Sequence, residues 1–392
     1  MTNSRPIMPW FLATCAIFFT RALLFSSFVS RGPEVQAALH LNTGEMGLFS
    51  MLYPAGGLAG ITFSSWLVKR FGARAINAAT FIVGSVGFVA LGFAIINGNL
   101  LLSSILLFVI GLPMAINDFV GNFQGTEVNN ASPRSLMPAI HGAFGVGMLL
   151  GATLSGWLIG AQIDIGTSFA FIGVFVGVAS VLAGITFSGR SAIELSAAEK
   201  ERNRQDSVKV WFEKRTWLIA IIGFSFIMAE SSAGTWVPIA LTQVGYSGAQ
   251  AAFAFAILWM LVTFGRAIGG PIVDKIGRRA TVLASALLTA AGIVIFMGGA
   301  TLGLPYVGLV CWGFGIALGM PMAVAALGDD PEMASPRVNM IITMVYLSSV
   351  TVGPALGAIG QSLGIYVAFA IPLIMMLISA AISGVTKPAL QK

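Results

Sequence analysis

Residues 270–279 read Gly-Pro-Ile-Val-Asp-Lys-Ile-Gly-Arg-Arg, and residues 65–74 echo them as Ser-Trp-Leu-Val-Lys-Arg-Phe-Gly-Ala-Arg. A second motif, Ala-Ser-Pro-Arg, occurs at 131–134 and again at 334–337, at nearly the same offset. A third pair, Gly-Leu-Pro-Met-Ala at 111–115 and Gly-Met-Pro-Met-Ala at 319–323, needs a short gap to align. Weak echoes at a half-length offset are typical of transporters built from two parallel repeats. The sequence therefore predicts two related halves.

The composition is that of a membrane protein. Of 392 residues, 57% are hydrophobic and 9% are charged, whereas a soluble domain carries about 25% charged residues. A bilayer-crossing helix needs about 20 mostly apolar residues, and long continuous apolar runs argue against the weakly alternating strands of a β-barrel. Twelve segments meet this criterion, so we predict an all-α membrane protein with spans near 8–30, 45–68, 75–96, 100–124, 136–161, 168–188, 216–242, 250–272, 280–299, 304–327, 338–361 and 365–386.

The basic residues predict the orientation of these spans. All of the 21 Lys and Arg residues except Arg21, Arg31 and Arg266 fall in the terminal tails or in alternate connecting segments. By the positive-inside rule these segments are cytoplasmic, which places both termini in the cytoplasm of a bacterial-type inner membrane. The net charge of +6 therefore reflects topology, and we expect no nucleic-acid partner.

One long polar segment, 189–215, carries acidic and basic residues at spacings that suit a surface helix. We interpret it as a cytoplasmic linker between two six-helix bundles, at 1–188 and 216–392. The predicted protein is a monomer in the lipid bilayer, and with two His and two Cys it is expected to hold neither a metal nor a cofactor.

The stretch at 270–279 resembles the signature of the major facilitator superfamily, in which a Gly, an Asp and a Gly are followed by basic residues. Gly270, Asp274 and Gly277 fit, as do the two arginines that follow, whereas the first-half copy has Ser65 and Lys69 at the positions of the first Gly and the acid. The resemblance implies a secondary transporter that works by alternating access. It also implies a cytoplasmic gate that includes Asp274, Arg278 and Arg279. We expect Arg266 to brace this gate; a pair with a group on the first or the eleventh span is the alternative.

Shorter stretches are similar to the fucose-permease-like group of proton-linked symporters within this superfamily. They lie at 30–34, 44–47, 117–127 and 141–142. This resemblance favours proton-coupled uptake of a sugar-like solute.

Ionisable residues inside spans cost on the order of 3 kcal/mol by insertion scales, so each is a functional candidate. Asp118 and Asn122 lie four apart and therefore on one helix face. Asp118 is the leading candidate for proton coupling, followed by Glu230 and Glu127. The alternative is a fixed buried pair, for example Arg21 with Asp118 or Glu230, and Glu127 can also be solvated near the end of its span.

Arg21 lies too deep in the first span to reach an interface, and a guanidinium binds carboxylate or phosphate in a two-pronged fashion. This predicts an anionic solute such as a sugar acid or another organic acid. A neutral sugar is the alternative, and it would use hydrogen-bonding and stacking side chains. Candidates for contact with solute are Arg21, Asp118, Asn122, Gln124, Glu230, Trp236, His141 and Tyr346; for Trp236 an interfacial anchor, and for His141 and Tyr346 helix packing, are the competing interpretations.

Other functions fit less well. Proton-coupled efflux of drugs or metabolites is the closest alternative, but the Gly-Pro signature expected on the fifth span is absent there and appears as Gly353-Pro354 on the eleventh. A membrane enzyme needs a set of catalytic side chains, and we find none. Most buried charge falls in the N-terminal half, which predicts that recognition and coupling centre there.

Overall fold

The computed structural model describes residues 7–134, 136–187, 206, 208–299, 304–330 and 333–388. Within these residues the chain is almost entirely helical and contains no strand. Most of the segment that we interpret as a surface-helical linker lies outside the described residues.

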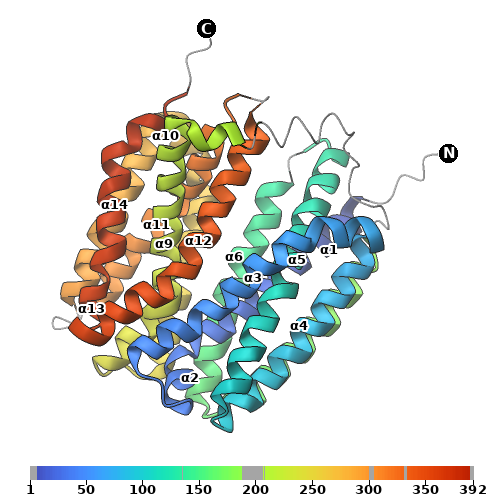
Figure 1. Cartoon of the computed structure of the whole chain (residues 1–392), viewed down its shortest axis with the longest axis vertical. Helices are drawn as coiled ribbons and strands as arrows, with labels where there is room; N and C mark the ends of the chain where they lie inside the picture. Colours follow the sequence, from blue (N-terminus) through green and yellow to red (C-terminus); the bar gives the residue numbers. More distant parts are fainter. Residues whose placement is uncertain are drawn as a thin grey trace. The chain divides into compact units, whose positions relative to one another are not determined.

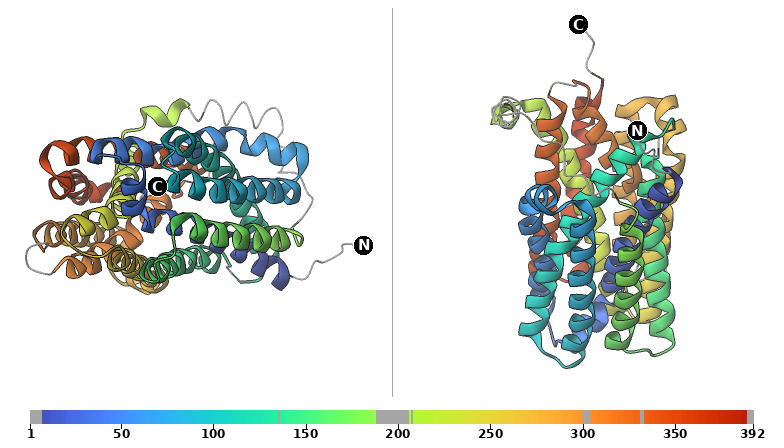
Figure 2. Two further views of the ribbon diagram at one scale, coloured as in Figure 1. Left: turned by 90° about the horizontal axis from the view of Figure 1, so that it is seen from below. Right: turned by 90° about the vertical axis from the view of Figure 1, so that its right-hand side faces the viewer.

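The chain divides into two compact units. Unit 1 holds residues 1–42, 49–193 and 241–256, and unit 2 holds 43–48, 194–240 and 257–392. The first set of helices, coloured blue to green in Figure 1, is α1 Ile7–Ser30, α2 Gly32–Ala38, α3 Thr43–Phe71, α4 Ala73–Ile96, α5 Leu100–Ala131, α6 Met137–Gly160 and α7 Ile165–Gly184. The long helices of these colours run along a common direction in the right-hand view of Figure 2, as membrane-crossing helices do.

The second set follows a short 3₁₀ turn. It comprises η1 Val210–Phe212, α9 Lys214–Gln243, α10 Gly248–Gly299, α11 Pro305–Leu327, α12 Ala334–Leu363, α13 Ile365–Ala368, α14 Ala370–Ile382 and η2 Ser383–Thr386. Eleven helical segments of the described chain are long and apolar enough to cross a membrane. One of them, α10, contains two spans joined at Gly277, so the predicted total of twelve is consistent with the structure.

Glycines at equivalent turns of the two halves explain the sequence echo. Gly72 separates α3 from α4 with φ 80° and ψ 152°, and Gly277 interrupts α10 with φ 80° and ψ 161°. A residue with a Cβ atom rarely adopts such a positive φ. Both copies of the motif therefore encode the same sharp turn between consecutive spans.

Close helix packing builds each unit. In unit 1, Phe88 of α4 stacks on Phe169 of α7 with ring centroids 4.2 Å apart, and Gly147 and Gly151 of α6 lie against the backbone of α1. In unit 2, the fully buried Trp312 packs edge-on against Phe296 at 5.9 Å. Small residues let membrane helices approach closely, so that dispersion contacts and hydrogen bonds form between them.

Candidate substrate and coupling site

Arg21 and Asp118 form an ion pair inside unit 1. Arg21 lies on α1 and Asp118 on α5, and Nη1 of Arg21 contacts Oδ1 of Asp118. Asn122, one turn further along α5, donates its Nδ2 to the same carboxylate oxygen at 3.1 Å and to the Asp118 carbonyl at 2.9 Å. The two side chains thus share one face of α5, as their spacing predicts. The side chains of Arg21 and Asp118 are 13% and 36% exposed, so the pair is only partly enclosed.

Aromatic rings surround the Arg21 guanidinium. Its carbon lies 5.1 Å from the centroid of the Phe18 ring and 5.3 Å from that of Phe144. His141 meets Phe18 edge to face at 5.2 Å, which places His141 in the same cluster. Cation–π contacts stabilise a guanidinium in a partly dry environment, so the two rings help to hold Arg21 beside Asp118.

Gln124 and Glu127 lie further along α5. The Gln124 side chain is fully enclosed; its Oε1 accepts a hydrogen bond from Trp10 Nε1 at 2.8 Å, and its Nε2 donates to Glu127 at 3.4 Å. The sequence predicts that Gln124 contacts solute. In the structure its amide instead accepts a hydrogen bond from α1 and so connects α1 to α5. Glu127 is half-buried beside Gln124.

Unit 2 contains a second ion pair of the same kind. Nη2 of Arg266 on α10 lies 3.0 Å from Oε2 of Glu230 on α9, and the two side chains are 31% and 19% exposed. The Arg266 guanidinium also lies 5.9 Å from the ring centroid of Trp259. Two predictions are corrected here: Arg266 pairs with Glu230 instead of bracing Asp274, and buried charge is not concentrated in the N-terminal half. The physical reason is helix rotation, which turns Arg266 toward α9.

Two further candidates in unit 2 are placed as follows. Trp236 is fully enclosed, so it is neither an interfacial anchor nor exposed to a solute in this conformation. Tyr346 is half-buried on α12.

Cys15 and Cys311 are free, and among the described residues no group of three His, Cys, Asp or Glu side chains could hold a metal ion.

Arg278, which the sequence places in the expected gate, forms an ion pair with an acid that the sequence analysis missed. Arg278 Nη1 lies 2.8 Å from Oδ1 of Asp329, and Arg215 Nη2 lies 2.9 Å from its Oδ2. Asp274 and Arg279 are exposed, and neither takes part in an ion pair among the described side chains. In this conformation Arg278 therefore pairs with Asp329, which follows the end of α11, while Asp274 is exposed on α10.

A neighbouring arginine, Arg337, pairs with two further acids of unit 2. Arg337 lies 2.8 Å from Glu213 and 3.3 Å from Asp330. Hydrogen bonds from Arg337 hold the pKa of Glu213 below its usual value. A signal for this group was present in the sequence: Asp330 precedes Arg337 by the same seven residues that separate Glu127 from Arg134.

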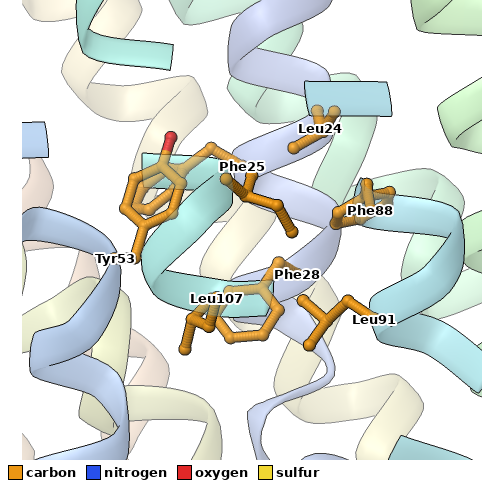
Figure 3. Close-up of a pocket in the computed structure, with 8 residues that line it drawn as sticks. Leu24, Phe25, Phe28, Tyr53, Phe88, Leu91 and Leu107 are labelled. Atoms are coloured by element: carbon orange, nitrogen blue, oxygen red, sulfur yellow. The ribbon is translucent and has the colours of Figure 1, made fainter. Parts of the chain in front are cut away.

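Unit 1 also contains a small apolar pocket. It is lined by Leu24, Phe25, Phe28, Tyr53, Phe88, Leu91, Leu107 and Ile110. Figure 3 shows the Tyr53 hydroxyl pointing away from Leu91 and Leu107. Without a charged side chain in its lining, this pocket is poorly suited to a polar solute, and the ion pairs remain the candidate site.

Two units of long apolar helices, each with a partly buried arginine–carboxylate pair, are typical of a multi-pass membrane protein. The chain belongs to the Major Facilitator Superfamily, whose sequence pattern it matches over residues 10–354. It is therefore a transporter and not an enzyme. It is similar to an uncharacterized MFS-type transporter of Yersinia pestis, with 27% identity over 385 residues that cover 96% of each chain.

Solved transporters share the fold. The nucleoside transporter NupG superimposes with a TM-score of 0.73 at 13% identity, covering 96% of this chain and 98% of that one. A variant of the E. coli fucose:proton symporter FucP gives a TM-score of 0.69 at 14% identity, covering 98% and 100%. The predicted membership of the major facilitator superfamily is thus confirmed, and the fold is shared with NupG and FucP alike.

Proposed function

We propose that this chain is a proton-coupled transporter of a small anionic solute, such as a sugar acid or another organic acid. The observation that carries the proposal is the partly exposed Arg21–Asp118 pair inside unit 1. A guanidinium offers five N–H donors in a rigid fork. Because Asp118 contacts only Nη1 among them, the remaining edge of Arg21 is suited to a solute carboxylate.

Competition for Arg21 would couple the solute to protons. A solute anion that binds Arg21 weakens its attraction to Asp118, and an ionised carboxylate without a counter-charge is costly inside a membrane. Proton uptake by Asp118 removes that cost. Solute and proton then occupy the site together, and their joint release restores the ion pair.

The Glu230–Arg266 pair is the secondary candidate for coupling, since it has the same chemistry in unit 2. Asn122 and His141 are proposed as polar contacts for the body of the solute, because both belong to the Arg21 cluster. The proposed gate consists of Arg278 with Asp329, together with Arg337 and Glu213.

Neutral sugars and nucleosides form the second solute class, because the structures with a similar fold include a fucose:proton symporter and a nucleoside transporter. Efflux of lipophilic cations is less well supported, because a cation meets repulsion from Arg21. A thermal-shift screen of the purified protein separates these classes, since a ligand stabilises the state that it binds. We expect stabilisation by glucuronate or gluconate in preference to fucose, uridine and tetraphenylphosphonium.

The decisive experiment is uptake into proteoliposomes by Asp118→Asn. Asparagine keeps the shape of the side chain but cannot carry the proton, so accumulation driven by a pH gradient should fall to the background of empty liposomes. Exchange of labelled for unlabelled solute should continue, because it needs no net proton movement. Glu127→Gln is the comparison on the same helix: we assign the coupled proton to Asp118 and not to Glu127, which accepts a hydrogen bond from Gln124, so this variant should accumulate solute normally. Full accumulation by Asp118→Asn would remove Asp118 from the coupling role.

A further inference from the structure

A chain of four buried polar side chains lies in unit 1 and joins α1, α7, α4 and α5. The Thr20 and Ser180 hydroxyl oxygens are 2.7 Å apart. Asn77 donates Nδ2 to the Ser180 carbonyl at 3.1 Å, and Asn117 donates Nδ2 to Asn77 Oδ1 at 2.9 Å. Thr20 is 2% exposed and the other three are fully enclosed.

The two ends of this chain are the sequence neighbours of the candidate site. Thr20 immediately precedes Arg21 on α1, and Asn117 immediately precedes Asp118 on α5. The buried hydrogen bonds connect the four helices in series, and the Arg21–Asp118 ion pair connects the first of them, α1, to the last, α5. Together these contacts form a closed loop, which we call the circuit. Buried, fully enclosed hydrogen bonds fix the helices that carry them more strictly than apolar contacts do, because an apolar contact tolerates sliding.

Two details indicate that the circuit is more than packing. The Oδ1 atom of Asn117 is buried and has no hydrogen-bond partner among the described residues, which costs free energy that an apolar side chain would avoid. A Cβ atom at Gly184 of α7 would overlap the amide of Asn77, so glycine at that position makes room for the asparagine. Stability alone does not explain this arrangement.

We propose that Thr20, Asn77, Asn117 and Ser180 are positioning residues, which hold α1 and α5 in the register that brings Arg21 to Asp118. This inference rests on the proposed function of that ion pair as the solute and proton site. None of the four residues reaches the solute in this scheme. They act through the pair, by fixing the distance and angle at which its two charges meet.

The test is a double-mutant cycle on the intact protein, read out as the melting temperature in detergent. Thr20→Val removes the hydroxyl and keeps the shape of the side chain, and Asp118→Asn removes the charge of the pair. If Thr20 acts through the pair, the combined variant should lose clearly less stability than the sum of the two single losses. Thr20→Ser keeps the hydroxyl and should behave as wild type.

Thr14→Val is the matched control. Thr14 lies on the same helix and is fully enclosed, but among the described residues its hydroxyl bonds only to the carbonyl of Trp10 in its own helix, at 2.9 Å. Its loss should add to that of Asp118→Asn. Additive losses for Thr20→Val as well would overturn the proposal and leave the chain a purely structural contact.

A second measurement covers the case in which Thr20→Val proves too unstable to purify. Asn77→Ala should then weaken stabilisation by glucuronate at least several-fold in thermal-shift titrations, while Thr14→Val does not. Equal affinity in the two variants would also overturn the proposal. Failure of the proposed function is separate: it would appear as normal proton-driven accumulation by Asp118→Asn, whatever the outcome of the cycle.

Discussion

At the scale of single residues, Arg21 determines which solutes the proposed site accepts. Replacement of Arg21 by Gln removes the charge and keeps much of the length of the side chain. Hydrogen bonds to charged groups contribute about 1.5–3 kcal/mol, so binding of a sugar acid should weaken roughly 10- to 100-fold. Binding of a neutral sugar should change far less. Thermal-shift titrations with glucuronate and glucose measure both effects.

The matched control is Arg266→Gln, which removes the arginine of the second pair. If unit 1 alone recognises the acid, this variant should retain glucuronate binding. Equal loss for the acid and the neutral sugar in Arg21→Gln would instead indicate that Arg21 is structural.

Glu213 predicts how stability depends on pH. It precedes α9, outside the membrane spans, and hydrogen bonds from Arg337 lower its pKa from the ordinary value of 4.5. A carboxyl whose pKa is lowered by folding stabilises the folded state above its unfolded pKa, and that contribution is lost as pH falls through the folded pKa. The melting temperature should therefore drop as the pH is lowered below about 4.5.

Glu213→Gln should lower the melting temperature at neutral pH and flatten this part of the pH profile. Arg337→Gln should do the same, and the two changes together should lose less than their sum because they break one interaction. If the acid transition of the wild type persists unchanged in both variants, other carboxyl groups cause it.

At the scale of secondary-structure elements, the position of Arg21 depends on how closely α6 approaches α1. A Cβ atom at Gly147 would overlap the carbonyl oxygen of Phe19, two residues before Arg21. Backbone cannot yield as a flexible side chain does, so Gly147→Ala should destabilise the protein by about 1–3 kcal/mol, the usual range for overpacking. The melting temperature of the purified variant measures this loss.

Gly142→Ala is the control on the same helix, because a Cβ atom there meets nothing within 4 Å. It should leave the melting temperature unchanged or raise it slightly, since alanine favours the helix over glycine. If both variants melt alike, close packing of α6 on α1 is not what holds Arg21.

The sequence predicts the elements well and their contacts poorly, for a physical reason. Hydropathy and length locate the spans, because the bilayer imposes the same requirement on each of them. The echoed motif also coincides with the turns at Gly72 and Gly277. Which side chains meet depends on how each helix is rotated about its axis, and nearly uniform apolarity around a span leaves that rotation undetermined by pattern alone.

Particular residues show where that limit falls. The spacing of Asp118 and Asn122 was sufficient to predict that they share a helix face, because both lie on one helix. Arg266 has its partner on another helix, and the partner of Arg278 is Asp329, 51 residues further along the chain. No local pattern connects such pairs. The hydrogen bond between Asn77 and Asn117 was not predicted either, because Asn77 gave no signal and Asn117 appeared only within the stretch 117–127 that carries the family resemblance.

At the scale of the whole molecule, charge distribution predicts the orientation in the membrane. All Lys and Arg residues except Arg21, Arg31 and Arg266 lie in the tails or in alternate connections, and Arg31 is fully buried against Glu34 and the carbonyl of Ile163. Each of these three exceptions forms an ion pair with an acid of its own unit, so they do not affect the rule. We expect the connection that includes Arg134 to lie in the cytoplasm, together with both termini.

Reporter fusions test this orientation. A fluorescent protein fused after residue 388 should fluoresce and alkaline phosphatase fused there should be inactive, because the phosphatase needs the oxidising side of the membrane to form its disulfides. Fusion after Ile163, in the turn between α6 and α7 that lacks basic residues, should give the opposite pair of signals. An active phosphatase at residue 388 would invert the whole topology. The proposed gate at Asp329 would then close the outer side instead of the cytoplasmic side.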